Sequence, residues 1–292
     1  MTHTGKVLVT GATGNVGSAV LDNLVTTDLS LRALIHDESK ARTMRDRGVE
    51  AFVCDFLEPE SLAPALEGAS MLLLITPHHP EQVAHATNVI EAARDSGNDP
   101  RIVRLSVAQA SHEAPTKNCK HHAEIEEELI SSGLPYTRIR PTTFMQNTLA
   151  TARTIASEGK IYQPFKDGKL GMIDVRDIGE VAAKVLTEEG HEGKTYTLTG
   201  PVAISFHDIA EVLSKVLGKK VDYVPISLEK AKEAMLGMGL SEWKAEVLIE
   251  YARAHSQGYS NFTTEDVEQL TGHTAASYRE FAADFAHAFG GA

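Results

Sequence analysis

Short apolar runs alternate with amphipathic stretches along the first half of the chain. The apolar runs predict strands at Val7–Val9, Leu31–Ile35, Ala51–Val53, Met71–Ile75, Ile102–Leu105 and Tyr136–Ile139. The amphipathic stretches predict helices at Ser18–Val25, Glu81–Arg94 and Ala123–Leu129. Strands that are apolar throughout and separated by helices are typical of a parallel sheet covered on both faces. We therefore predict an α/β fold with a Rossmann-like, doubly wound parallel sheet.

After Pro141 the alternation becomes less regular. The pattern predicts a hairpin or loop at residues 165–171, a helix at Asp174–Leu186 and a strand at Thr195–Leu198. Beyond Ser205 it predicts mostly helices, interrupted by a strand at Val221–Ile226. We expect a dinucleotide-binding Rossmann domain at residues 1–145 and a smaller, mostly helical C-terminal lobe at residues 146–292. Residues from about 172 to 200 are expected to return to the sheet.

Composition and charge narrow the class of partner. The 292 residues are 42% hydrophobic and 23% charged, with a formal net charge of −12. An acidic chain is a poor ligand for nucleic acid or for an anionic membrane. Only Cys54 and Cys119 are present, and neither a signal pattern nor an apolar run of about 20 residues appears. We expect a cytoplasmic protein that binds a small-molecule substrate, without a nucleic-acid or membrane partner.

A glycine-rich turn follows the first predicted strand and precedes a helix. It reads Thr10-Gly-Ala-Thr-Gly-Asn-Val-Gly17. In such a turn the first glycine permits the tight bend, the second lets the backbone approach a pyrophosphate, and the third lets the helix pack closely on the strand. The N–H groups at the helix start then face the phosphates. The predicted cofactor contacts here are Gly11, Thr13, Gly14, Asn15 and Val16.

The ends of the second and third strands bear on which dinucleotide binds. A carboxylate at the end of the second strand accepts hydrogen bonds from ribose, whereas a cation favours a 2′-phosphate. This chain carries both signals, with His36 and Lys40 beside Asp37. For Lys40 a solvated helix face is the alternative. At the third strand end, Asp55 and the neighbouring Phe56 are placed to contact adenine, or Asp55 is simply a strand-end aspartate.

Four segments together resemble the NmrA-like atypical short-chain dehydrogenases, and most closely their triphenylmethane reductase and quinone reductase members. These segments are Thr10–Gly17, Ser131–Pro141 with the following Phe144–Asn147, Asp174–Ile178 and Val185–Leu198. The glycine turn is shared by many extended and atypical dehydrogenases, while the middle segments are more specific. The resemblance spans nearly the whole chain.

The resemblance implies a Rossmann domain, a small C-terminal lobe and a cleft between them for nicotinamide and substrate. It implies NADP(H) as the favoured cofactor, with NAD(H) as the alternative. It further implies cofactor contacts after the fourth, fifth and sixth strands, at Thr76, Pro77, Ser106, Pro141 and Thr142. Phe144 and Met145 are then expected near the substrate.

The chain departs from the family pattern in three places. Many relatives carry arginine at the position of His36. The Tyr-x-x-x-Lys pair of the wider dehydrogenase class is absent, because Thr116 stands four residues before Lys120. The catalytic lysine of the isoflavone-reductase branch falls on His122.

Helical geometry makes His122 the candidate catalytic residue. At about 100° per residue, His122 points into an apolar stripe of Ile125, Leu129 and Ile130. Glu126 lies four residues on, where it can reach His122 and orient a proton donor. The alternative is a core histidine that bonds to backbone, with Glu126 paired to Arg138 or Arg140.

No metal site is predicted, because His78 and His79 lack a third ligand in the sequence pattern. The sequence favours an NAD(P)H-dependent reductase of a small conjugated or aromatic acceptor, such as a quinone, dye or enone. Since a nicotinamide brings the reactive hydride itself, the missing tyrosine–lysine pair is compatible with this activity. The alternative is a regulator of the NmrA type that senses NAD(P) without turnover.

Overall fold

The computed structural model describes residues 5–291, which divide into two compact units. The first unit comprises the chain up to Ala114, Cys119–Arg140 and Ile178–Thr197. The second comprises Pro115–Asn118, Pro141–Asp177 and the chain from Leu198 onward. Within the described residues, no helix is both long and apolar enough to cross a membrane.

A seven-stranded sheet organises the first unit. Its order is β3-β2-β1-β4-β5-β6-β8, and the pairs from β3 to β6 are parallel. The strands are β1 (Lys6–Val9), β2 (Ser30–Ile35), β3 (Glu50–Val53), β4 (Ala69–Leu74), β5 (Arg101–Leu105), β6 (Tyr136–Pro141) and β8 (Thr195–Leu198). The chain runs outward from β1 in one direction and from β4 in the other. The sheet therefore has its topological switch point between β1 and β4, where open α/β sheets bind ligands.

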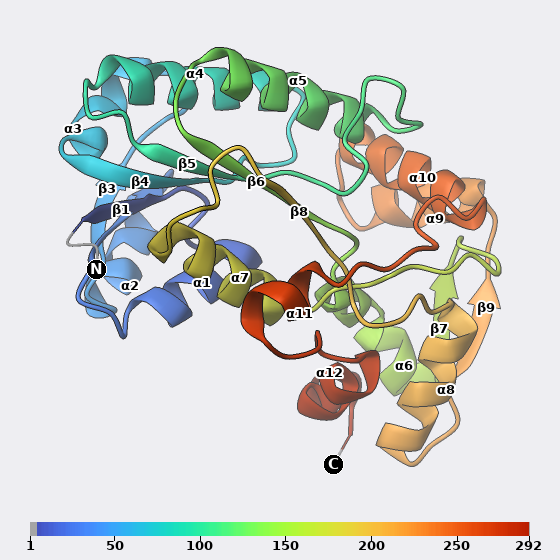
Figure 1. Ribbon diagram of the computed structural model, residues 1–292. Coiled ribbons are helices and arrows are strands. Elements are labelled where there is room, and N and C mark those ends of the chain that lie inside the picture. Colours follow the sequence, from blue (N-terminus) through green and yellow to red (C-terminus); the bar gives the residue numbers. More distant parts are fainter. Residues whose placement is uncertain (1–4, 292) are drawn as a thin grey trace. The chain divides into compact units, whose positions relative to one another are not determined.

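Helices cover both faces of this sheet. They are α1 (Asn15–Leu24), α2 (Ala41–Asp46), α3 (Ala63–Leu66), α4 (Gln82–Asp95), α5 (Lys117–Ser131) and α7 (Val175–Thr187). Figure 1 shows α4 and α5 on one face, with α1, α2 and α7 on the other. Leu8, Leu72 and Ile102 from the strands pack with Ile125 and Leu129 of α5 in one buried cluster. Burial on both faces explains why these strands are continuously apolar.

The second unit has its own core. Its helices are α6 (Ala152–Glu158), α8 (Phe206–Leu217), α9 (Leu228–Gly237), α10 (Glu242–Ser256), α11 (Asp266–Thr271) and α12 (Tyr278–Asp284). A parallel pair joins β7 (Lys160–Gln163) to β9 (Asp222–Pro225). Phe206, Leu213 and Phe281 are among its buried residues. Short 3-10 turns occur at η1 (Glu38–Lys40), η2 (Pro59–Ser61), η3 (Met145–Thr151) and η4 (Ala286–Phe289).

The predicted α/β class and doubly wound sheet are confirmed, and every predicted strand has an observed counterpart. Two local expectations were wrong. The sequence pattern missed β7, a four-residue strand that pairs with β9 about 60 positions along the chain. Ile130, which was assigned to the apolar stripe of α5, is 44% exposed, so the buried stripe consists of Ile125 and Leu129.

Candidate functional site

The three glycines of the turn between β1 and α1 have different structural roles. Gly11 has φ of +60°, in the left-handed region that favours glycine. A Cβ on Gly17 would lie 2.2 Å from the carbonyl oxygen of Gly11, so only glycine lets α1 begin this close to the turn. A Cβ on Gly14 would meet only that same oxygen, at 3.3 Å. The backbone at Gly14 is therefore bare, as a closely approaching phosphate requires.

The start of α1 fits an anionic ligand. Gly14 is its N-cap and supplies no side-chain acceptor, and the first turn contains no acidic residue. The N–H groups at the start of a helix have no partner within the helix and carry partial positive charge. Asn15 is exposed in this first turn. A pyrophosphate placed here would receive those N–H groups without meeting a competing carboxylate.

Thr10 fastens this turn to the neighbouring strand. Its hydroxyl accepts the Ile75 N–H at 2.6 Å and donates to the Ile75 carbonyl oxygen at 2.8 Å. The Thr10 N–H also donates to the Leu73 carbonyl oxygen, at 3.0 Å. These bonds hold the C-terminal ends of β1 and β4 together at the switch point.

The end of β2 presents an exposed, mixed set of charges. His36, Asp37 and Lys40 are all exposed. The Asp37 carboxylate accepts the Ser39 N–H at 2.8 Å and caps η1, and the hydrogen bonds from Ser39 lower the pKa of Asp37. Asp37 is therefore ionised but already engaged as a cap. Asp55, after β3, likewise accepts the Leu57 N–H at 2.9 Å, with Phe56 half-buried beside it.

A buried arginine, Arg104, lies near the C-terminal end of β5. It is fully buried, and its guanidinium donates to the Leu74 carbonyl oxygen at 3.1 Å and to Thr76 Oγ1 at 2.9 Å. Its Nη2 also lies 3.3 Å from Nδ1 of His122. Burial lowers the pKa of Arg104 to about 9, and the Glu126 charge opposes that shift, so the group stays protonated at neutral pH. Arg104 was not among the site residues predicted from the sequence. The feature that could have pointed to it is a charged residue inside an otherwise apolar strand.

Arg104 determines the protonation and the tautomer of His122. Burial and then the Arg104 charge hold the pKa of His122 well below its usual range, so the imidazole is neutral. A guanidinium only donates, so Nδ1 must accept and the ring proton lies on Nε2. His122 is 5% exposed. It therefore offers a neutral N–H donor rather than an imidazolium acid.

One of the two predictions for Glu126 was that it pairs with His122, but in the structure it pairs with other residues. Its carboxylate accepts from Arg138 at 3.0 Å, from Arg140 at 2.5 and 2.9 Å, and from the Ser106 hydroxyl at 2.5 Å. Burial alone would raise the pKa of Glu126, but the hydrogen bonds from Arg140 and Ser106 lower it overall. This is the alternative in which Glu126 pairs with the arginines of β6. The Ser106 hydroxyl proton is consequently committed to Glu126.

The segment after β6 is held tightly. Thr142 is buried, and its hydroxyl donates to the Gly171 carbonyl oxygen at 2.5 Å. Phe144 is half-buried and forms a bridge with Ile173. Met145, which was expected to contact substrate, is only 1% exposed and packs into the core of the second unit. The contacts of Phe144 and Met145 with substrate stay predictions, and Phe144 is the more exposed of the two.

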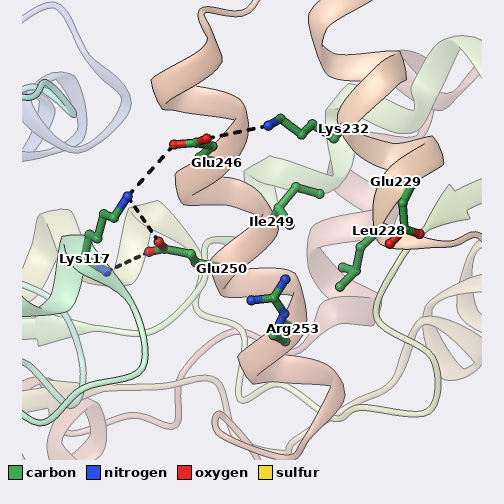
Figure 2. Close-up of a pocket in the computed structure, with 8 residues that line it drawn as sticks. All are labelled: Lys117, Leu228, Glu229, Lys232, Glu246, Ile249, Glu250 and Arg253. Atoms are coloured by element: carbon green, nitrogen blue, oxygen red, sulfur yellow. Dashed lines mark hydrogen bonds and ion pairs between the residues drawn. The ribbon is translucent and has the colours of Figure 1, made fainter.

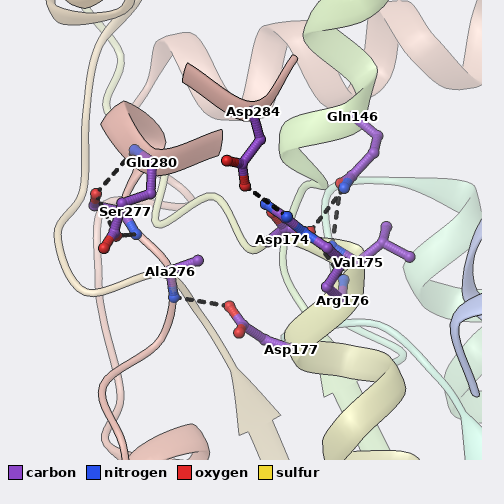
Figure 3. A network of polar contacts seen from close by, with 9 residues as sticks. All are labelled: Gln146, Asp174, Val175, Arg176, Asp177, Ala276, Ser277, Glu280 and Asp284. Atoms are coloured by element: carbon purple, nitrogen blue, oxygen red, sulfur yellow. Dashed lines mark hydrogen bonds and ion pairs between the residues drawn. The ribbon is translucent and has the colours of Figure 1, made fainter. Parts of the chain in front are cut away.

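The segment Asp174–Ile178, which leads into α7, has a structural role. Asp174 accepts from Gln146 and Arg176, and Arg176 reaches Asp284 at 2.6 Å (Figure 3). The Asp177 carboxylate accepts the Ala276 N–H at 2.9 Å. This network ties the start of α7 to the residues around α12.

A groove of about 370 Å³ lies between α9 and α10 (Figure 2). Most of its lining residues are charged, and Lys117 lies 3.7 Å from Glu250 and 3.9 Å from Glu246. Lys232 lies 3.6 Å from Glu246. Pockets for conjugated ligands have mostly apolar walls. This groove is therefore not our candidate for the acceptor site.

A doubly wound sheet with a bare glycine turn at its switch point defines a dinucleotide-binding protein. A sequence profile of the NmrA-like family matches residues 3–280, and the chain belongs to this family.

Characterised relatives cover nearly the whole chain. An NAD(P)H azoreductase from Xenophilus azovorans is 37% identical over 286 residues, which cover 98% of this chain and 100% of the relative. The crystal structure of the Escherichia coli NADPH-dependent quinone oxidoreductase complexed with NADPH superimposes with a TM-score of 0.86 at 29% identity, covering 96% and 99% of the two chains. The Citrobacter sp. triphenylmethane reductase complexed with NADP(H) has a TM-score of 0.85 at 31% identity, covering 95% and 99%.

Proposed function

We propose that the protein is an NAD(P)H-dependent oxidoreductase that transfers a hydride to a small conjugated or aromatic acceptor, such as a quinone, a dye or an enone. The observation that carries the proposal is the β1–α1 turn, where the start of α1 has no side-chain cap and no acidic residue. The acceptor class follows the azo, quinone and triphenylmethane reductases that this chain is similar to. NADP(H) is the favoured cofactor.

The proposed cofactor contacts lie at the C-terminal ends of the strands. Gly11, Thr13, Gly14, Asn15 and Val16 bind the pyrophosphate, and Asp55 and Phe56 contact the adenine. His36 and Lys40 face the 2′ position of the ribose, where their exposed side chains are available to a phosphate. The remaining proposed contacts with the nicotinamide half are Thr76, Pro77, Ser106, Pro141 and Thr142.

When bound, a reduced nicotinamide supplies the hydride, and the residues around it supply orientation and electrostatics. We propose that the Nε2–H of His122 donates a hydrogen bond to the acceptor oxygen as negative charge develops there. Arg104 acts through His122 by keeping Nδ1 as the acceptor, and is therefore a positioning residue. Reduction of a quinone to a hydroquinone consumes the hydride and one further proton. A cationic triphenylmethane dye consumes the hydride alone.

Steady-state oxidation of NADPH and of NADH, with a quinone, an azo dye and a cationic triphenylmethane dye as acceptors, tests the proposal. Turnover is expected with at least one of these acceptors. Cofactor binding without turnover of any acceptor would contradict the reductase and favour a regulator that senses the dinucleotide.

A matched pair of variants at Asn15 ties turnover to the glycine turn. Asn15→Glu places a carboxylate where the pyrophosphate is proposed to lie, whereas Asn15→Gln keeps the residue neutral. Like charges about 4 Å apart at a protein surface repel by about 1–4 kcal/mol, so we expect the KM for NADPH to rise about tenfold or more in Asn15→Glu alone. A carboxylate at this position stabilises the helix itself, so loss of folding would not explain the result. Equal KM values in the two variants would argue against phosphate binding at this turn.

A further inference from the structure

Two imidazoles and a carboxylate come together where α4 begins. His79 and Glu81 belong to the loop after β4, and His85 lies on the first turn of α4. Each side chain offers one ligand atom, and these three atoms lie within 4.8 Å of one another. It is the one such group of three found in residues 5–291. The sequence pattern indicated no third ligand for His78 and His79. In the structure, the end of the loop after β4 and the first turn of α4 place Glu81 and His85 close to His79.

His85 is the fixed member of this group. It is 8% exposed, and its Nδ1 is buried without a hydrogen-bond partner among the described residues. Phe56 packs edge-on against its ring, with centroids 6.1 Å apart, and His79 stacks on it at 5.1 Å. A buried imidazole nitrogen without a partner costs stability unless something binds it.

His79 and Glu81 form the accessible side of the group. Nδ1 of His79 accepts the Glu81 N–H at 3.2 Å and lies 3.7 Å from Oε2 of Glu81, and both side chains are about half exposed. Two ligands of a tetrahedral ion with bonds of 2.0–2.2 Å are about 3.4 Å apart. The observed separation of 3.7 Å is close to this value, and His79 must turn away from the Glu81 N–H before its Nδ1 can bind an ion. Rotation of the exposed His79 and Glu81 side chains can bring them toward the fixed ring of His85.

The donor set favours one class of ion. Two imidazole nitrogens with one carboxylate oxygen suit Zn²⁺ and neighbouring first-row divalent ions, whereas Mg²⁺ and Ca²⁺ prefer oxygen ligands throughout. The negative charge of Glu81 offsets the positive potential at the start of α4, which would otherwise repel a cation. Three protein ligands leave a coordination position open to water.

We propose that His79, Glu81 and His85 bind Zn²⁺ or a similar first-row divalent transition-metal ion. The metal site does not depend on the proposed hydride transfer, and it adjoins the proposed cofactor site through Phe56, which packs against His85. His79 and Glu81 capture the ion from solvent, and the buried ring of His85 anchors it.

Calorimetric titration of the untagged, chelator-treated full chain with zinc chloride tests the site. The wild type is expected to bind one equivalent, and Co²⁺ in its place should give the visible absorption bands of a four-coordinate ion. His79→Ala and Glu81→Gln should each weaken zinc binding by at least about tenfold, since loss of an outer-shell partner alone costs that much. Because both positions are exposed, these variants should melt at the wild-type temperature.

His112 provides the matched control. It pairs with Glu127 at 2.7 Å, a histidine–glutamate contact that lacks a third ligand. His112→Ala should therefore leave zinc affinity unchanged. If the wild type binds no zinc, or if His79→Ala combined with Glu81→Gln binds it as tightly as the wild type, the site does not exist.

Discussion

At the scale of single residues, a buried guanidinium decides what His122 can do. Nδ1 of His122 faces Arg104 at 3.3 Å, and burial together with that charge keeps the pKa of His122 well below its usual range. Because the imidazole is already neutral, its donor role does not depend on protonation near pH 6.5. His122 is therefore suited to stabilise a developing oxyanion with an N–H group rather than to release a proton.

This role predicts a difference between acceptors. His122→Phe removes the N–H donor, and loss of one such donor costs on the order of 100-fold in kcat. We expect that loss with a quinone, whose oxygen gains charge, and little change with a cationic triphenylmethane dye. His122→Gln retains an N–H group and should recover part of the quinone activity. Equal losses with both acceptors, measured by NADPH oxidation, would show that His122 has only a structural role.

His36 carries the prediction for cofactor preference. It is exposed at the end of β2, where arginine would offer a permanent charge to a 2′-phosphate. A hydrogen bond between charged groups contributes about 1.5–3 kcal/mol, so His36→Arg should raise the ratio of NADPH to NADH affinity about tenfold or more. His36→Gln is the neutral control. An unchanged ratio in fluorescence titrations with both cofactors would remove His36 from the binding site.

At the scale of elements, the glycine turn depends on how closely α1 approaches β1. A Cβ on Gly17 would lie 2.2 Å from the Gly11 carbonyl oxygen and 2.8 Å from Ala12 Cα, both of them backbone atoms. The strand and the helix must therefore separate if any larger residue is introduced, which would also displace the N–H groups proposed to bind phosphate.

Two glycine-to-alanine substitutions should have opposite effects on stability. Gly17→Ala overpacks the turn and should lower the free energy of unfolding by about 1–3 kcal/mol. Gly237, the last residue of α9, has no atom within 4 Å of its Cβ position, so Gly237→Ala should be neutral or stabilising by up to about 1 kcal/mol. Urea denaturation of both variants measures these changes. A Gly17→Ala protein as stable as the wild type would contradict the close packing described here.

At the scale of the whole molecule, two of the hydrophobic clusters among the described residues belong to different units. One lies between the sheet and α3, α4 and α5 in the first unit, and the other surrounds Phe206 and Phe281 in the second. The proposed cofactor contacts at Gly11 and Gly14 belong to the first unit, whereas Thr142 and Phe144 belong to the second.

The glycine turn, the order of strands and helices in the first unit, and the family can all be predicted from the sequence alone. These features are local, because a strand such as Val7–Val9 and a turn such as Gly11–Gly17 are encoded by neighbouring residues. The fold class and the family are confirmed, and the relatives to which the chain is similar include an NAD(P)H azoreductase and an NADPH-dependent quinone oxidoreductase. The individual contacts with cofactor and substrate, including those of Phe144 and Met145, stay predictions.

The chemistry of the polar groups depends on contacts that the sequence does not reveal. Arg104, Thr76 and His122 come from β5, the end of β4 and α5, and their contacts set which nitrogen of His122 carries the proton. Glu126 has partners on β6, which helical spacing alone could not choose over His122. The glycine turn, which indicates the class of protein, can therefore be recognised in the sequence. The protonation and hydrogen bonding of the side chains near it cannot, because hydrogen bonding and burial depend on residues distant in sequence.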